Sequence, residues 1–293
     1  MSRPFRFGVN LMTPAGGAQW REKCRRAEAL GYDVILVPDH LGMPAPFPAL
    51  VAAAEATERP RLGTFVLNAA FWNPHLLARE AAGTDALTDG RFELGLGTGY
   101  VREEHERSGI AFRSAGGRVD RLRHTVEEWD RLTRDEGHVP AAVQRPRPPL
   151  LIGGNGDRVL RIAAEHARTM AFTGGREDRN GALVAHTAEE LAERVETFRK
   201  LAEGRPEPVE LNLLLQFAEV TDDRRARVRE LAALAPHLAE EQVAALPMLA
   251  LGSAGDVADQ LRERRERYGF TYFAVLEHSM ESFAPAIAEL SGE

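Results

Sequence analysis

The chain alternates short apolar runs with longer amphipathic segments, and this alternation repeats eight times along its 293 residues. An apolar run of about four to eight residues indicates a buried strand, whereas the segments between the runs have the apolar spacing of helices. Strands joined by helices lie parallel, because each helix returns the chain to the same end of the sheet. Eight such units in a chain of this length predict a closed (β/α)8 barrel, the TIM-barrel fold.

Eight strands are expected, at residues 5–10, 33–37, 61–67, 92–96, 149–153, 169–173, 211–220 and 271–276. Two of the connections are expected to be long loops, at residues 98–117 and 174–187. The stretch 222–246 predicts a helical insertion between the seventh strand and the eighth. Because no linker interrupts the alternation, residues 1–293 are expected to form a single domain.

The composition excludes several classes of function. The formal net charge is −7 and acids are interleaved in every basic stretch, which argues against nucleic acid as a partner. No apolar run approaches the roughly 18 residues that a membrane span needs, so no membrane partner is expected. The lone cysteine, Cys24, allows no intrachain disulfide, and no leader-like segment precedes the first strand. These features predict a cytoplasmic protein.

In a (β/α)8 barrel the chemistry sits at the carboxyl ends of the strands. The second predicted strand ends in Asp39 and His40, an acid and an imidazole that can bind polar ligand atoms or move a proton. The alternative for this pair is a structural cap of the following loop. Asn68 ends the third strand and either contacts a ligand or satisfies backbone groups. The strand ends carry no metal-binding pair of histidines, so no metal site is expected.

Two glycine runs follow neighbouring strands. The run Gly97-Thr98-Gly99 follows the fourth strand, where the missing side chains let a flat ring approach the backbone, although a tight turn has the same requirement. The run Gly153-Gly154-Asn155-Gly156 precedes a helix, so that its backbone N–H groups can hold a phosphate, with a plain turn as the alternative. The charged loop after Tyr100 supplies Glu103 and Glu104 as acids that can face a ligand.

These motifs resemble those of the luciferase-like monooxygenase superfamily, and most of all its actinobacterial branch that uses the deazaflavin coenzyme F-420. The resemblance runs from Phe5 to about Leu290. The motifs that carry it are AEALGYD at 27–33, VPDH at 37–40, LGT at 62–64, NP at 73–74, DGRFELGLGTGY at 89–100 and LLIGGNG at 150–156. The resemblance implies a luciferase-like barrel that holds the cofactor ring at its carboxyl mouth.

The resemblance also implies roles for individual residues. It implies that Asp39 contacts the cofactor, that His40 lies near the reactive face of the ring, and that Asn68 is a further cofactor contact. It places a non-proline cis peptide near Phe65-Val66, behind the ring. The cofactor-binding residues expected in all are Asp39, Phe65, Val66, Asn68, Gly97, Thr98, Gly99, Tyr100, Gly153, Gly154, Asn155 and Gly156. The catalytic candidates are His40, Glu103 and Glu104.

One departure from the family pattern bears on the activity. Deazaflavin-dependent sugar-phosphate dehydrogenases of this superfamily carry a catalytic glutamate directly after the glycine run, where this chain has Tyr100. The departure disfavours that activity and leaves the proton donor open, with Glu103 and Glu104 as the nearby acids.

The function expected is hydride transfer between coenzyme F-420 and a small organic substrate. One alternative is an FMN-dependent monooxygenase that receives reduced flavin from a reductase partner, and another is a flavin-binding protein without enzymatic activity. The oligomeric state stays open, with a homodimer as the commonest closed arrangement.

Overall fold

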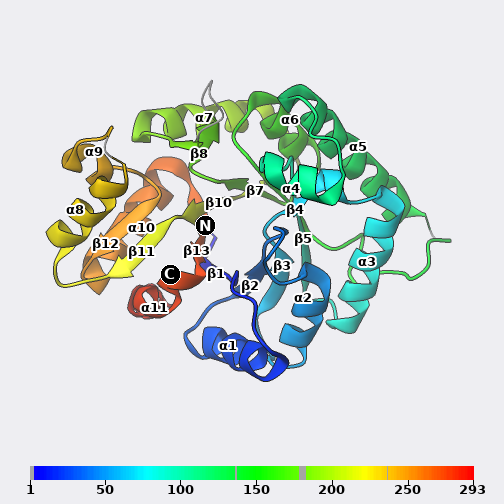
Figure 1. The fold of residues 1–293 in the computed structure, drawn as a ribbon, viewed down its shortest axis with the longest axis horizontal. Coiled ribbons are helices and arrows are strands. Elements are labelled where there is room, and N and C mark those ends of the chain that lie inside the picture. The colour runs from blue at the N-terminus through cyan, green and yellow to red at the C-terminus, as the bar shows by residue number, and fades with distance from the viewer. Residues whose placement is uncertain (1–2, 136, 178–182, 236) are drawn as a thin grey trace.

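A closed barrel of parallel strands forms the centre of the computed structural model, which describes residues 3–135, 137–177, 183–235 and 237–293 (Figure 1). Its strands follow the order β3-β2-β1-β13-β10-β7-β6-β5-β4, and β3 also pairs with β5 to close the ring. Each of these pairings is parallel. Because β3 and β4 follow each other at one position of the ring, the barrel has eight positions, which confirms the predicted (β/α)8 fold.

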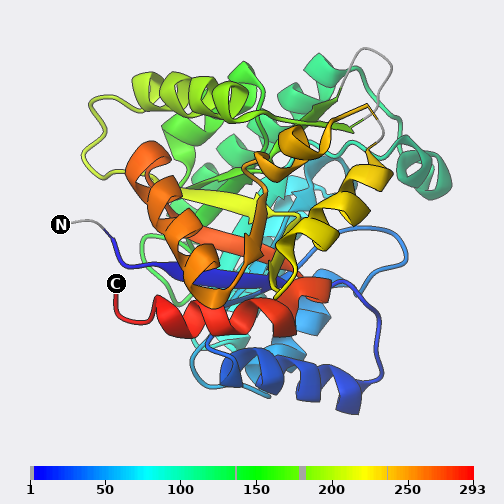
Figure 2. The ribbon, with the colours of Figure 1, turned by 90° about the vertical axis from the view of Figure 1, so that its left-hand side faces the viewer.

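The barrel strands are β1 (Arg6–Asn10), β2 (Val34–Val37), β3 (Arg61–Thr64), β4 (Leu67–Asn68), β5 (Phe92–Gly97), β6 (Leu150–Gly153), β7 (Thr169–Phe172), β10 (Glu210–Leu215) and β13 (Phe270–Leu276). The helices packed around them are α1 (Gly17–Ala29), α2 (Pro46–Ala54), α3 (Pro74–Leu87), α5 (Ala115–Arg134), α6 (Asp157–His166), α7 (Ala188–Leu201), α10 (Ala254–Tyr268) and α11 (Met280–Glu289). Figure 2 shows the strands inside this layer of helices, with both ends of the chain on one side. The strands are buried on both faces, as expected of apolar runs in a parallel barrel.

The third predicted strand is interrupted. Residues 61–67 were expected to be continuous, but β3 ends at Thr64 and β4 begins at Leu67. The bond between Phe65 and Val66 is a cis peptide, at the place that the family resemblance implies. A short 3-10 helix, η1 (Ala69–Phe71), follows β4 and is capped by the side chain of Asn68.

Both predicted loops contain regular structure. The segment 98–117 holds a helix, α4 (Arg102–Ser108), which ends at Gly109 in the left-handed conformation (φ 70°). The segment 174–187 holds an antiparallel pair, β8 (Gly175–Glu177) and β9 (Leu183–Ala185). The residues between these two strands, 178–182, lie outside the described part of the chain.

The insertion before β13 contains strands as well as the predicted helices α8 (Arg224–Leu234) and α9 (Glu240–Ala244). The seventh predicted strand, 211–220, divides into β10 and β11 (Phe217–Val220), and β11 pairs with β12 (Leu249–Gly252). This pair leaves the barrel because it packs on a small apolar core of its own, formed by Val228, Leu231, Val243, Met248, Leu249 and Leu251. Among the described helices, none combines the length and the apolar composition that a membrane crossing requires.

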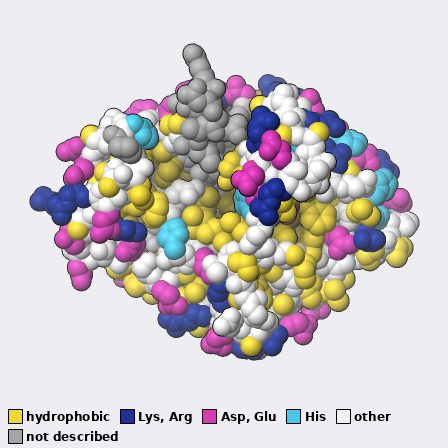
Figure 3. Space-filling model, viewed as in Figure 1, with side chains coloured by type: hydrophobic (Ala, Val, Ile, Leu, Met, Phe, Trp, Pro, Cys, Tyr) yellow, Lys and Arg dark blue, Asp and Glu magenta, His cyan; other side chains and the backbone are white. Residues whose placement is uncertain are grey.

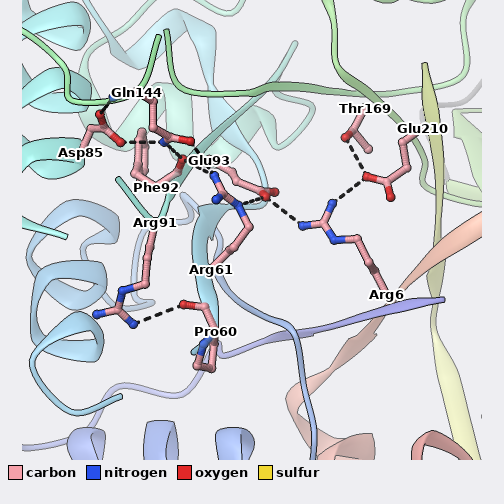
Figure 4. A network of polar contacts seen from close by, with 10 residues as sticks. All are labelled: Arg6, Pro60, Arg61, Asp85, Arg91, Phe92, Glu93, Gln144, Thr169 and Glu210. Carbon is pink, nitrogen blue, oxygen red and sulfur yellow. Dashed lines mark hydrogen bonds and ion pairs between the residues drawn. The ribbon is translucent and has the colours of Figure 1, made fainter. Parts of the chain in front are cut away.

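The two ends of the barrel differ in character. The carboxyl ends of the strands open on a cavity, visible as a central hollow around which apolar atoms gather (Figure 3). An ionic network closes the amino ends (Figure 4). In it, the buried Glu93 carboxylate accepts hydrogen bonds from Arg61 and from Arg6 Nη2 at 2.8 Å, while Arg6 Nη1 donates to Glu210 at 2.6 Å. Burial alone would raise the pKa of Glu93, but the two guanidinium groups hold that pKa below its ordinary value.

We expect Glu93→Gln to lower the free energy of unfolding by about 2–3 kcal/mol, because Arg61 loses its carboxylate partner and Arg6 keeps only Glu210. The same network makes wild-type stability depend on pH. Its contribution is fully present above the unfolded carboxyl pKa of 4.5, and it is lost as the pH falls through the lower pKa of folded Glu93. Denaturant unfolding between about pH 7 and pH 3 measures both effects. Glu207→Gln, at an exposed carboxylate paired with Arg168, is the control, and equal unfolding midpoints for the two variants would contradict the argument.

Candidate active site

A cavity of about 760 Å³ lies at the carboxyl end of the barrel. Its walls come from the ends of the barrel strands and from the segments that follow them. Each of the residues expected to bind a cofactor lines this cavity: Asp39, Phe65, Val66, Asn68, Gly97, Thr98, Gly99, Tyr100, Gly153, Gly154, Asn155 and Gly156. The volume is within the usual range for sites that enclose a small ligand, about 300–1,000 Å³.

Two hydrogen bonds to one oxygen fix the carboxylate of Asp39. Its Oδ2 accepts hydrogen bonds from the backbone N–H of Asn68 at 3.1 Å and from the indole Nε1 of Trp72 at 2.9 Å. Burial raises the pKa of Asp39 above its ordinary value, against the opposing effect of these two donors. Trp72 therefore fixes a site carboxylate, a role that sequence reasoning missed because the indole reaches Asp39 only through the turn that follows β4.

His40 and Glu104 form a pair at the mouth of the cavity. His40 Nδ1 lies 2.9 Å from Glu104 Oε1, so that Nε2 is the ring nitrogen left for a ligand. The Glu104 side chain is 12% exposed, and the edge of the Tyr100 ring lies beside the imidazole at a centroid distance of 5.9 Å. Glu103, the other expected acid, is exposed and does not line the cavity. The two acids diverge because successive residues of a helix point in directions about 100° apart.

The next residue of α4 supports Asn68. His105 is fully buried between the rings of Phe71 and Phe112, each at a centroid distance of 5.1 Å. Its Nε2 lies 3.0 Å from Asn68 Nδ2, and Asn68 Oδ1 accepts from the N–H of Ala70. Through Glu104 and His105, the short helix α4 thus holds two of the cavity's polar side chains, His40 and Asn68.

The last residues of β5 and β6, Gly97 and Gly153, form part of one cavity wall and pack against Val66. A Cβ at Gly97 would lie 2.6 Å from Val66 Cγ2, and one at Gly153 would lie 3.1 Å from Val66 Cγ1. Asn155 and Thr173 also line the cavity, and Asn155 Nδ2 donates to the Thr173 hydroxyl at 2.8 Å. The buried Asn155 Oδ1 has no hydrogen-bond partner within the described structure. Gly156 is the N-cap residue of α6, and no side chain caps the first N–H groups of this helix.

Further cavity residues were not anticipated from the sequence: Asn10, Met12, Met43, Arg118, His186, Glu190, Glu193, Arg194, Leu214, Gln216 and Leu276. Most of them lie on helices or strands whose sequence patterns predict the element but not its orientation toward the cavity. Within the described ranges, no group of three or more His, Cys, Asp or Glu side chains is placed to hold a metal ion.

A closed parallel barrel with an imidazole–carboxylate pair at a cavity on its carboxyl end is the architecture of a TIM-barrel enzyme. Residues 1–269 match the family described as luciferase-like monooxygenase, and the chain belongs to this family.

The curated relatives include one protein named as flavin-dependent and another named as F420-dependent. The oxygenase component of a flavin-dependent trigonelline monooxygenase from Acinetobacter baylyi is 28% identical over 169 residues, or 52% of this chain and 47% of that protein. An F420-dependent glucose-6-phosphate dehydrogenase from Intrasporangium calvum is 32% identical over 179 residues, or 52% of each chain. The alignments thus span about half the length of these two relatives.

Solved structures share the fold along nearly the whole chain. The monooxygenase RslO1 from Streptomyces bottropensis superposes with a TM-score of 0.73 at 21% identity, covering 97% of this chain and 96% of that one. An F420-dependent secondary alcohol dehydrogenase in complex with an F420-acetone adduct superposes with a TM-score of 0.76 at 15% identity, covering 98% and 99%. Identities this low show the fold alone.

Proposed function

We propose that this protein is an oxidoreductase that moves a hydride between a deazaflavin coenzyme of the F-420 type and a small organic substrate. The observation that carries the proposal is the His40–Glu104 pair at the edge of a cavity whose β5–β6 wall is built from glycine. The coenzyme, when bound, supplies the hydride chemistry, and the protein supplies binding, orientation and a proton. The buried Cys24 suits a reducing, cytoplasmic setting.

The residues of the cavity fit such a coenzyme. The glycines at positions 97 and 153 leave room for the Val66 side chain, and Val66 lines the cavity as an apolar contact for a flat ring. Asn155 Oδ1 is a buried acceptor for a hydroxyl of the coenzyme's side chain. At Gly156 the first N–H groups of α6 have no side-chain cap, and a helix N-terminus of this kind favours a phosphate.

His40 is the residue that we propose to move the proton. Because Glu104 engages Nδ1, the neutral ring presents an acceptor at Nε2, and the protonated ring presents a donor there. The carboxylate also stabilises the positive charge that His40 gains when it takes a proton from the substrate. His40 can therefore serve hydride transfer in either direction.

A second candidate is an FMN-dependent monooxygenase that receives reduced flavin from a separate reductase. It is favoured by the similarity to the oxygenase component of the flavin-dependent trigonelline monooxygenase. Membership in a family whose compared relatives are named as oxidoreductases disfavours a binding protein without activity.

A pair of fluorescence titrations tests the choice of cofactor. The purified protein is titrated with coenzyme F-420 and, separately, with FMN. We expect submicromolar affinity for F-420 and affinity at least tenfold weaker for FMN. Gly97→Val should weaken F-420 binding at least tenfold because its side chain displaces Val66 in the cavity wall. Gly255→Ala, in open space on α10, should leave the affinity unchanged. Tighter binding of FMN than of F-420 would refute the proposal and favour the FMN-dependent monooxygenase.

A further inference from the structure

We infer that the second ligand of this cavity is an uncharged molecule with an apolar body and one hydroxyl or other hydrogen-bond donor. The inference rests on the proposed function, because it concerns the substrate that meets the coenzyme in the same cavity. It follows from how charge is distributed around the cavity walls.

One side of the cavity presents uncharged side chains along four strands. The strands β10, β13, β1 and β2 are consecutive neighbours in the barrel. From them and the residues just after them come the members of what we call the neutral wall: Leu214, Gln216, Leu276, Asn10, Met12, Pro38 and Met43. Of these seven, two are amides and the rest are apolar. The carboxylate of Asp39, which follows β2, is engaged by Asn68 and Trp72 instead, and His40 stands at the edge of the wall.

The other charged residues of the cavity come from helices. Glu104 lies on α4, Arg118 on α5, and Glu190, Glu193 and Arg194 lie on α7. These helices flank the glycine runs, where the proposed coenzyme would place its phosphate. The charged side chains of these helices thus lie on the side of the glycine runs, whereas a substrate on the opposite side meets the neutral wall.

The Lys23 ammonium, which lies close to the neutral wall, already has a carboxylate partner. Lys23 forms an ion pair with Glu277, which also accepts hydrogen bonds from the N–H groups of Met12 at 2.6 Å and Thr13 at 2.7 Å. This arrangement fixes the segment that presents Met12 to the cavity. An anionic substrate would have to be desolvated against this wall without a cationic partner from it, which is unfavourable, whereas an apolar body gains from the same burial.

Asn10 gives the wall one directional contact. The residue is 4% exposed, and its Nδ2 donates to the carbonyl of Phe65 at 3.4 Å. The other atom of the amide, Oδ1, is buried and has no partner within the described ranges. A buried acceptor in a cavity wall favours a ligand that brings a donor. This contact is the reason for including a hydroxyl or similar group in the ligand class.

The test uses two probes of similar size on the protein saturated with F-420: neutral 1-phenylethanol and anionic phenyl phosphate. Their affinities are measured by calorimetry. We expect 1-phenylethanol to bind at least tenfold more tightly than phenyl phosphate. Leu276→Lys should reverse that preference by placing a cation in the neutral wall, and Leu276→Met should keep it. Coenzyme affinity, measured first for each variant, shows whether the variant is folded.

A third probe, ethylbenzene, tests the role of Asn10, because it lacks the hydroxyl of 1-phenylethanol. The wild type should prefer 1-phenylethanol over ethylbenzene at least fivefold, and Asn10→Leu should abolish that preference. Tighter binding of phenyl phosphate to the wild type, or failure of 1-phenylethanol to bind, would overturn the inference while the proposed function stands. Failure of F-420 itself to bind, seen before any probe is added, would instead refute the proposed function.

Discussion

Replacing His40 with alanine should lower the rate of hydride transfer by about 10²–10⁴-fold and change the affinity for the coenzyme by no more than a few-fold. The imidazole is the group at the cavity edge whose Nε2 is left for the substrate, since Glu104 holds Nδ1 at 2.9 Å. In the proposed arrangement the coenzyme contacts mainly the segments around Gly97 and Gly153, which the substitution leaves intact. Rates are measured anaerobically from the change in coenzyme absorbance, and affinity is measured by fluorescence titration.

Two neighbouring acids on α4 provide a matched comparison for this prediction. Glu104→Gln should reduce the rate at least tenfold, because the imidazole loses the negative charge that stabilises its protonated form. Glu103→Gln, one residue away at an exposed position, should leave the rate within twofold of the wild type. Equal losses of rate in the Glu104→Gln and Glu103→Gln variants would contradict the proposed role of Glu104. An undiminished rate in His40→Ala would contradict the proposed role of His40.

Gly95→Ala should be among the most destabilising single substitutions in the barrel. A Cβ at Gly95 would lie 1.9 Å from the backbone oxygen of Thr64. Two hydrogen bonds hold these residues together. The Thr64 hydroxyl accepts from Gly95 N at 2.8 Å and donates to Gly95 O at 2.9 Å. The new methyl group therefore has to push β5 away from β3, and we expect the free energy of unfolding to fall by about 3 kcal/mol or more.

Gly255→Ala is the matched control for that measurement. Gly255 lies in α10, where a Cβ would have no neighbouring atom within 4 Å, and alanine is favoured over glycine within helices by up to about 1 kcal/mol. Denaturant unfolding should therefore show Gly255→Ala to be as stable as the wild type or slightly more stable. If Gly95→Ala unfolded at the same denaturant concentration as this control, the result would contradict the claim that β3 and β5 lie too close together for a side chain at Gly95.

The fold was predictable because its signal is repeated along the chain. Eight alternations of buried strand and helix leave few arrangements other than a parallel barrel, and the strand ends then bring Asp39, His40 and Asn68 to one cavity. The division of the predicted strand at 211–220 was not predictable. That run is largely apolar, and its turn toward β12 depends on the pairing of Phe217–Val220 with Leu249–Gly252, far along the chain.

The contacts that support the site residues were not predictable either, because they join residues far apart in the sequence. Trp72 reaches Asp39 from 33 positions away, and His105 reaches Asn68 from 37 positions away. No local pattern reports contacts of that kind. The sequence also left the choice between Glu103 and Glu104 open, because only the orientation of α4 turns Glu104 toward His40.

The most direct test of the account is a crystal structure of the protein with oxidised coenzyme F-420 bound. We predict that the ring lies against Val66 and the glycine wall of β5 and β6, with its reactive face open toward His40 Nε2. We also predict that the neutral wall stays free beside that face. A ring bound elsewhere, or bound with its reactive face turned away from His40, would contradict the account.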